Sequence, residues 1–318
     1  MEYCMSLHYN KKLFSDTLRA ASQHLDIKLE FVEKDYWITW VLSKLAICKY
    51  TDQAVFKGGT SLSKGYNLIE RFSEDVDIAL LNSKGKPGNE IKNILRTIEK
   101  QITVDLTELP IEGITSKGSR FRKSVFNYVT IERGNSNNKL IVEINSFSNA
   151  FHYERLPIKS MVFNFLMQTA NENYIEQYHL QPFYVNVLNK EQTLLEKMAS
   201  LIRFSFSENT VEGILEKVRH FYDLYYLMQM PSCRELVASV SFKKKIDTIL
   251  LHDKEIFKVP IGWQSKSVAE SPLITNFPTI WKQLKAKYQT ELSALAYRPI
   301  PDEADIAKCF EELIKTIK

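Results

Sequence analysis

Two aspartates inside a run that otherwise has the character of a buried strand constrain this chain more than any other feature. In the run DVDIAL, alternation of side chains between the two faces of a strand places Asp75 and Asp77 on one face. The apolar residues of the run lie on the other face and can enter a core. Two neighbouring carboxylates repel each other and are costly unless a cation lies between them. The pattern therefore predicts a metal-binding strand.

The segment before this strand has the character of a phosphate-binding turn. A short strand is expected to end at Lys57, followed by a turn at Gly58 and Gly59 and by a helix whose N-cap is Thr60 or Ser61. Backbone N–H groups at such a helix start are available to bind phosphate. A phosphate-binding turn followed by two metal-binding carboxylates predicts a site for a nucleoside triphosphate.

A third carboxylate can come from a hairpin further along the chain. The runs 124–133 and 139–147 flank the turn GNSNN and predict two antiparallel strands. Glu143 interrupts the second of these otherwise apolar runs, so it lies either at a sheet edge or at a site. Nucleotidyl transfer needs two metal ions about 3.5–4 Å apart. Glu143 is therefore the candidate third ligand beside Asp75 and Asp77.

A change of pattern near residue 189 predicts two domains. Helical and strand patterns alternate before it, and a short strand is expected at Phe183–Leu188. The pattern after it is helical, with helices predicted at 190–206, 209–230, 234–251, 279–295 and 303–317. We therefore predict an α+β fold, in which residues 1–188 form a mixed sheet with flanking helices and residues 189–318 form an all-helical C-terminal domain.

Composition places the chain among ordinary globular proteins. The 318 residues are 44% hydrophobic and 25% charged, and a formal net charge of +4 permits nucleic-acid binding without requiring it. The scattered cysteines lack CxxC spacing, so a zinc site is not expected. The N-terminus has no apolar segment of the signal-peptide type, and no run of about 18 apolar residues is present. We expect a cytoplasmic protein without a membrane span.

One charged triplet has two interpretations. Glu33, Lys34 and Asp35 lie early in a helix predicted over residues 28–49. They are either favourable acidic charge near a helix start on a solvated face, or part of a functional site.

Several other nucleotide-binding and hydrolytic motifs are absent from the sequence. The run GGTSLSKG lacks the residue order of a Walker A loop, and no G-x-G-x-x-G dinucleotide motif is present. The chain also has neither a Gly-x-Ser-x-Gly elbow nor a His-Glu-x-x-His metal pair. The paired aspartates and the glycine turn therefore carry the functional prediction.

GGTSLSK followed by RFSEDVDI resembles the core of the DNA polymerase β-like nucleotidyltransferase superfamily. More narrowly, the chain is similar to the abortive-infection AbiE-type toxins, the nucleotidyltransferase halves of bacterial toxin–antitoxin pairs, with their MenT relatives. The runs EKDYW, LLEKMASLIR, KVRHFYDLYYL and YRPIP fit the same family. The resemblance covers most of the chain and implies a nucleotidyltransferase-type sheet.

The resemblance implies roles for matching residues. Gly59 and Ser61, or the Thr60 hydroxyl, would contact triphosphate, Ser73 would support the nucleotide, and Asp75 and Asp77 would bind Mg²⁺. Lys197 in LLEKMAS would bind phosphate, and Asp223 in FYDLYYL would be needed at the site. The candidates are therefore Gly58, Gly59, Thr60, Ser61, Lys64, Arg71 and Ser73 for the nucleotide, Asp75, Asp77 and Glu143 for the metal, and Asp75, Asp77, Lys197 and Asp223 for catalysis.

Four of the basic and acidic candidates also have structural interpretations. Lys64 and Arg71, like Lys57, either meet phosphates or balance the acidic residues near the turn. Lys197 is either functional or a structural lysine whose ammonium reaches water past an apolar face. Asp223 is either functional or part of an exposed ion pair with Arg219 on the same helix.

The resemblance implies an enzyme that transfers a nucleoside monophosphate from an NTP to RNA, such as a tRNA 3′ end, and so blocks translation in antiviral defence. Mg²⁺ or Mn²⁺ would be the cofactor, and an antitoxin, for example a winged-helix DNA-binding protein, would be the partner. Two other readings stay open. One is nucleotidyl transfer to a protein or small molecule, and the other is a non-catalytic NTP-binding module.

Overall fold

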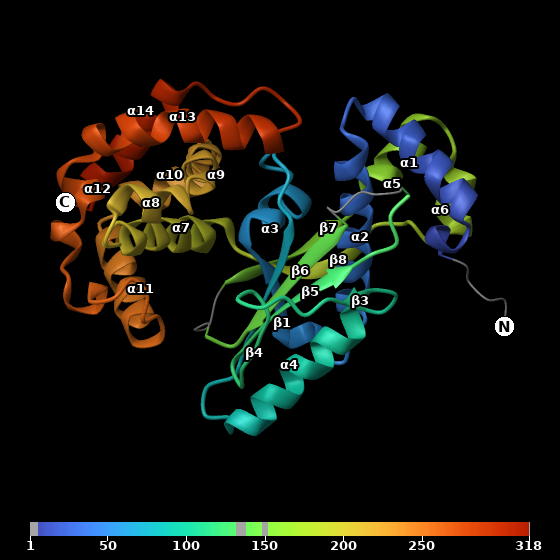
Figure 1. Ribbon diagram of the computed structural model, residues 1–318, viewed down its shortest axis with the longest axis horizontal. Coiled ribbons are helices and arrows are strands. Elements are labelled where there is room, and N and C mark those ends of the chain that lie inside the picture. Colours follow the sequence, from blue (N-terminus) through green and yellow to red (C-terminus); the bar gives the residue numbers. More distant parts are fainter. Residues whose placement is uncertain (1–5, 132–137, 148–151, 318) are drawn as a thin grey trace. The chain divides into compact units, whose positions relative to one another are not determined.

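The computed structural model describes residues 6–131, 138–147 and 152–317 (Figure 1). The chain divides into two compact units. The first comprises Met1–Asn67 and Phe72–Leu188, and the second comprises Leu68–Arg71 and Asn189–Lys318. The predicted division into domains at residue 189 stays a prediction, because compactness does not show that either unit folds by itself. The turn GNSNN of the predicted hairpin lies largely outside the described residues.

The first unit is built on a mixed eight-stranded sheet. Seven strands follow the order β3-β5-β6-β2-β1-β8-β7, and β4 pairs with β5 outside this path. Strand β2 is antiparallel to β1 and parallel to β6, which in turn is antiparallel to β5. The strands are β1 (Ala54–Lys57), β2 (Asp75–Leu80), β3 (Thr107–Glu108), β4 (Ser116–Lys117), β5 (Phe121–Asn127), β6 (Lys139–Asn145), β7 (Tyr153–Ile158) and β8 (Phe183–Leu188).

Helices of the first unit pack on this sheet. Helix α4 contacts β5, β6 and α2, helix α2 also contacts β8, and helix α3 contacts β1 and β2. The apolar sides of α2 and α4 and the buried residues of the strands form the core. The helices are α1 (Lys11–Leu25), α2 (Leu29–Ala46), α3 (Gly58–Lys64), α4 (Gly88–Ile102), α5 (Met161–Gln168) and α6 (Glu172–Gln177).

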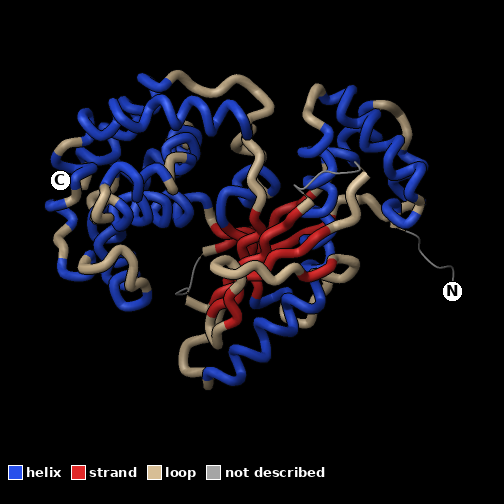
Figure 2. The backbone as a smooth tube through the Cα atoms, viewed as in Figure 1, coloured by secondary structure: helices blue, strands red, loops and turns tan. Residues whose placement is uncertain are grey.

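The second unit is helical beyond residue 189, as predicted (Figure 2). Its core includes an aromatic cluster in which the Phe221 ring lies 4.7 Å from Phe310 and 5.2 Å from Trp281, measured between centroids. The helices are α7 (Lys190–Phe204), α8 (Thr210–Leu215), α9 (Arg219–Leu227), α10 (Pro231–Ala238), α11 (Phe242–Ile256), α12 (Pro272–Thr275), α13 (Phe277–Leu295) and α14 (Glu303–Lys315). The mixed sheet and the helical C-terminal region confirm the predicted α+β class.

Two predicted helices are wrong in extent. The predicted helix 209–230 begins at the Asn209 cap but divides into α8 and α9, because residues between them form tight i→i+3 hydrogen bonds such as Lys217 N–H to the Ile214 carbonyl at 2.8 Å. The predicted helix 234–251 likewise divides into α10 and α11 at Ser239, whose backbone is extended. Helical periodicity continues across both breaks in the sequence, which is why the pattern did not reveal them.

No helix among the described residues is both long enough and apolar enough to cross a membrane.

A buried ion pair fastens α4 to the sheet. The Arg122 guanidinium of β5 donates two hydrogen bonds to Glu99 of α4, one of them from Nε at 2.9 Å. The Ser124 hydroxyl donates to the other carboxylate oxygen of Glu99 at 2.6 Å. Arg122 and Ser124 therefore face α4, and Lys123 between them faces the opposite side of the sheet.

Replacing Arg122 with Met leaves the buried Glu99 carboxylate without its cation. We expect the free energy of unfolding to fall by about 3–5 kcal/mol, measured by chemical denaturation. The double variant Arg122→Met/Glu99→Leu removes both charges and should recover most of the loss. Arg120→Met, at a neighbouring exposed position, is the control, and a single Arg122→Met variant no less stable than this control would contradict the expectation.

Candidate active site

A row of charged side chains crosses four strands of the sheet in the first unit. Asp77 on β2 is paired in register with Lys57 on β1 and with Glu143 on β6. Glu143 is in turn paired with Lys123 on β5. Directly paired residues share one face of a sheet. The row Lys57–Asp77–Glu143–Lys123 therefore places two carboxylates side by side between two cations, on the face opposite Arg122 and Glu99.

Asp75 lies two residues before Asp77 on the same face, as the alternation of the strand predicts. Val76 and Ile78 are fully buried on the other side. The alternative that Glu143 lies at a sheet edge is wrong, since β6 lies between β2 and β5. Glu143 is thus a half-buried carboxylate on an interior strand and faces the same side as the two aspartates.

The electrostatics of this row favour a bound cation. Burial, Glu143 and Asp75 raise the pKa of Asp77 to about 8, against the opposing effect of Lys57 and Lys123. Burial also raises the pKa of Glu143, against the opposing effect of Lys123, whose Nζ lies 3.7 Å from Oε2 of Glu143. The cations of the row therefore do not fully compensate its carboxylates. A divalent cation would stabilise the ionised form of Asp77.

Gly58 allows the backbone to approach Asp77 closely. Helix α3 begins directly at Gly58 after β1, and the φ angle of Gly58 is +80°, in the left-handed region. A Cβ atom at this position would lie 2.2 Å from Oδ2 of Asp77. Glycine is therefore required by both the backbone conformation and the contact.

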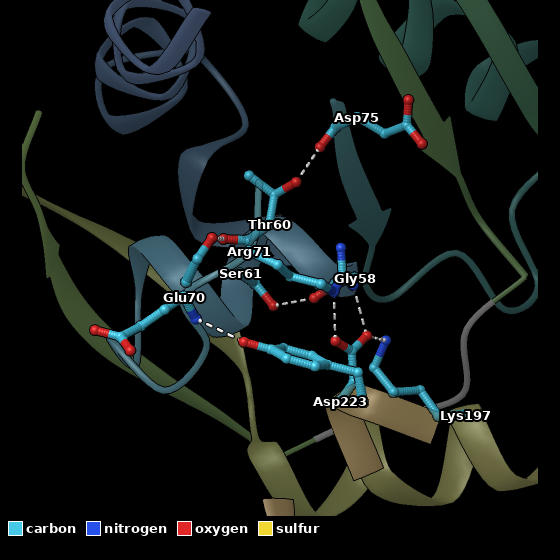
Figure 3. Close-up of polar contacts among 10 residues, drawn as sticks. Gly58, Thr60, Ser61, Glu70, Arg71, Asp75, Lys197 and Asp223 are labelled. Atoms are coloured by element: carbon cyan, nitrogen blue, oxygen red, sulfur yellow. Dashed lines mark hydrogen bonds and ion pairs between the residues drawn. The ribbon is translucent and has the colours of Figure 1, made fainter. Parts of the chain in front are cut away.

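The predicted Gly58–Gly59 turn and its cap are wrong in detail. Gly59 lies within the first turn of α3, and neither Thr60 nor Ser61 caps the helix, because both follow its first residue. The Thr60 hydroxyl donates to the Asp75 carbonyl at 2.5 Å, and the Ser61 hydroxyl donates to the Gly58 carbonyl at 2.8 Å (Figure 3). Both hydroxyls thus hold the backbone of the candidate site.

Lys64 forms an ion pair with the charged triplet of α2. Its ammonium donates to Asp35 and to the Lys159 carbonyl, both at 2.6 Å. Asp35 also accepts from the Met161 N–H at 2.7 Å. Lys64 therefore balances an acidic residue, and its predicted contact with phosphate stays a prediction. The interpretation of the triplet as a solvated face is wrong, because Glu33, Lys34 and Asp35 are all buried.

The second unit contains a buried ion cluster centred on Asp223. The Arg71 guanidinium binds both carboxylate oxygens, from Nε at 2.8 Å and from Nη2 at 2.7 Å. The Lys197 ammonium donates to Oδ2 at 2.6 Å (Figure 3). Asp223 has no exposed surface, and the two cations hold its pKa well below the usual range despite burial. Asp223 therefore does not form the exposed pair with Arg219, and the Lys197 ammonium is bound inside the unit.

Arg71 reaches this cluster because residues 68–71 are held by the second unit. The Tyr222 hydroxyl accepts from the Glu70 N–H at 3.3 Å, and the Tyr297 N–H donates to the Glu70 carbonyl at 3.0 Å. Sequence reasoning missed both tyrosines. The YRPIP run that contains Tyr297 was a family signal without an assigned role. Ser73 is half-buried two residues before Asp75, and its predicted role stays a prediction.

The oxygen ligands of β2 fit a hard divalent cation. Carboxylates are the ligands that Mg²⁺ and Mn²⁺ prefer, and Asp75 with Asp77 can supply them from one strand. Among the described residues, no three acidic, histidine or cysteine side chains are gathered closely enough to hold a metal ion. The aspartate pair is thus the part that fits, and a role for Glu143 as third ligand stays a prediction.

Comparison with known proteins places the chain in a family. The family described as "Nucleotidyl transferase AbiEii toxin, Type IV TA system" matches residues 40–311. No curated protein matches the chain. The chain is similar in structure to the nucleotidyltransferase toxin MenT4 from Mycobacterium tuberculosis H37Rv, with a TM-score of 0.52 and 16% identity, over 93% of this chain and 89% of MenT4. For JHP933 from Helicobacter pylori the TM-score is 0.47 at 16% identity, over 91% and 92% of the two chains.

The likeness to MenT4 shows a shared fold, and the family match spans most of the sequence. The paired aspartates of β2 lie within the matched residues. The chain belongs to the AbiEii family of nucleotidyltransferase toxins of Type IV toxin–antitoxin systems, and it is a nucleotidyltransferase.

Proposed function

We propose that the protein transfers a nucleoside monophosphate from an NTP to the 3′ hydroxyl of an RNA, with tRNA as the acceptor, and that it does so with a divalent cation held by Asp75 and Asp77. The observation that carries the proposal is the row Lys57–Asp77–Glu143–Lys123, in which burial and two neighbouring carboxylates raise the pKa of Asp77 to about 8. Two adjacent acids on an interior strand are a stable arrangement once a cation compensates their repulsion.

The reaction joins the hydroxyl oxygen of the acceptor to the α-phosphorus of the NTP. The bond from that phosphorus to the bridging oxygen of the β-phosphate breaks, pyrophosphate leaves, and the hydroxyl proton passes to solvent. When bound, Mg²⁺ or Mn²⁺ supplies Lewis-acid stabilisation of the charge on the triphosphate. The protein itself supplies position and electrostatics, which are the main contributions to catalysis of phosphoryl-type transfers.

Several residues of the chain receive roles in this proposal. Asp75 and Asp77 hold the cation, and Glu143 is their candidate third ligand. Backbone N–H groups at Gly58 and Gly59 bind the triphosphate. Thr60 and Ser61 act through their hydroxyl bonds to Asp75 and Gly58, which fix the backbone on both sides of the site.

The ion cluster of the second unit has a separate proposed role. Lys197 binds phosphate, and Asp223 orients it, since the carboxylate accepts from both the Lys197 ammonium and the Arg71 guanidinium. Arg71 is then a positioning residue for Asp223. Lys64, whose ammonium likewise binds a carboxylate, that of Asp35, stays a predicted phosphate contact.

The family supports the biological setting. We infer that the enzyme acts in the cytoplasm on tRNA and thereby blocks translation as part of abortive infection, and that an antitoxin of the winged-helix DNA-binding type restrains it. Membership of a Type IV toxin–antitoxin family supports the existence of an antitoxin.

Incubation with each labelled NTP, Mg²⁺ or Mn²⁺, and total cellular RNA and protein tests the proposal. We expect label in the tRNA fraction, and the variant Asp75→Asn/Asp77→Asn should lose at least about 100-fold in rate because the bound cation contributes several kcal/mol. Label in protein or small molecules would reassign the acceptor. NTP binding without any incorporation, or an unchanged rate in the double variant, would contradict the proposal.

Gly58→Ala tests the contact between α3 and Asp77. The new methyl group would collide with the Asp77 carboxylate, so we expect Mn²⁺ affinity, measured by electron paramagnetic resonance, to fall by about 10-fold or more. Gly85→Ala is a matched control, because Gly85 has the same left-handed conformation at φ +81° but an added Cβ there would meet no atom within 4 Å. Each substitution should cost about 1–2 kcal/mol of backbone strain. Equal Mn²⁺ affinity in the two variants would contradict the assignment.

A further inference from the structure

Helix α2 carries three consecutive charged residues that are all buried. Glu33, Lys34 and Asp35 have 1%, 6% and 3% of their surface exposed. Successive helical residues point about 100° apart, so the three side chains leave the helix in three directions. Burying charges is costly unless each has a partner. The partners therefore show what the triplet holds in place.

Lys34 holds the segment that leads directly into β2. Its ammonium donates to Glu74 at 2.6 Å and lies 5.9 Å from the centroid of the Phe72 ring. Phe72 stacks on Phe31, one helical turn before Lys34, with centroids 4.8 Å apart and an interplanar angle of 8°. Residues 72 and 74 are thus both bound to one face of α2, and Asp75 follows immediately.

Asp35 is linked to β2 indirectly, through helix α3. It accepts from Lys64, the last residue of α3, and from the Met161 N–H. Within α3, the Thr60 hydroxyl donates to the Asp75 carbonyl. The side chain before Asp75 and the carbonyl of Asp75 itself are therefore both fixed, one by Lys34 directly and one through α3.

Glu33 serves a different segment. Its carboxylate accepts from the Thr130 hydroxyl at 2.9 Å and from the Ile131 N–H at 2.7 Å. These residues follow β5, away in sequence from β2. Glu33 is as deeply buried as its two neighbours, and its hydrogen bonds to Thr130 and Ile131 hold the segment after β5, which makes it a natural comparison.

We propose that Lys34 is a positioning residue for the metal-binding carboxylates: by binding Glu74 and covering Phe72, it fixes the backbone from which Asp75 and Asp77 project. This role rests on the proposed function of the two aspartates. It accounts for the burial of Lys34, which the proposed reaction does not otherwise use. Outer contacts of this kind change metal affinity by about 10–100-fold when removed.

The test compares Mn²⁺ binding, measured by electron paramagnetic resonance, in the wild-type chain and in single variants. Lys34→Met is mild for the fold, because Glu74 is half exposed and can be hydrated alone, and Met can still cover Phe72. We expect Mn²⁺ affinity to fall by about 10-fold in Lys34→Met. Lys34→Arg keeps the cation and should bind Mn²⁺ within about 3-fold of the wild type. Glu33→Gln, the matched control, should bind Mn²⁺ like the wild type even if it lowers the unfolding midpoint.

Hydrogen exchange without metal gives a second readout. Lys34→Met should raise deuterium uptake in residues 72–77, and Glu33→Gln should raise it near residues 128–131. Wild-type Mn²⁺ affinity in Lys34→Met, or an equal loss in Glu33→Gln, would overturn the positioning role. If the wild-type chain binds Mn²⁺ no better than Asp75→Asn/Asp77→Asn, the proposed function is wrong, and this inference is wrong with it. The comparison of the wild type with that double variant therefore separates failure of the proposed function from failure of the positioning role alone.

Discussion

The repulsion between two adjacent carboxylates in the interior of the sheet is the constraint on which the rest of the first unit depends. Parallel pairing of β2 with β6 places Asp77 beside Glu143, and the flanking strands β1 and β5 place one lysine at each end of the row. The lysines reduce the repulsion without removing it, since the pKa values of both acids remain raised. A cation bound at this row would offset the repulsion that remains between its carboxylates.

The surroundings of this row are consistent with that use. Gly58 brings the backbone of α3 against Asp77, and the Thr60 hydroxyl binds the carbonyl of Asp75. Lys34 and Asp35 connect the preceding segments to α2 through ion pairs, and the pair between Asp35 and Lys64 is buried. The second unit builds its own ordered cluster, in which Asp223 binds Arg71 and Lys197 with short hydrogen bonds. In both units, ion pairs between different elements hold charged side chains in place, as preorganised catalysis requires.

Local features of the site could be predicted from the sequence, and its long-range partners could not. The shared face of Asp75 and Asp77 follows from the period of a single strand, and the strand Phe183–Leu188 was bounded correctly by its composition. The positions of Lys57 and Lys123 across from the acids depend on strand order, which alternation does not reveal. The ion pair between Lys64 and Asp35 could not be predicted, because the two residues lie 29 positions apart in the sequence. The division between α8 and α9 was hidden because the apolar spacing continues through it.

The most direct test of the central claim is a crystal structure with Mn²⁺ and a non-hydrolysable NTP, in which anomalous scattering locates the metal. We expect an Mn²⁺ peak within coordination distance of the Asp75 and Asp77 carboxylates and in contact with the triphosphate. A fully bound nucleotide with no Mn²⁺ at these aspartates, or with its Mn²⁺ held by other residues, would contradict it.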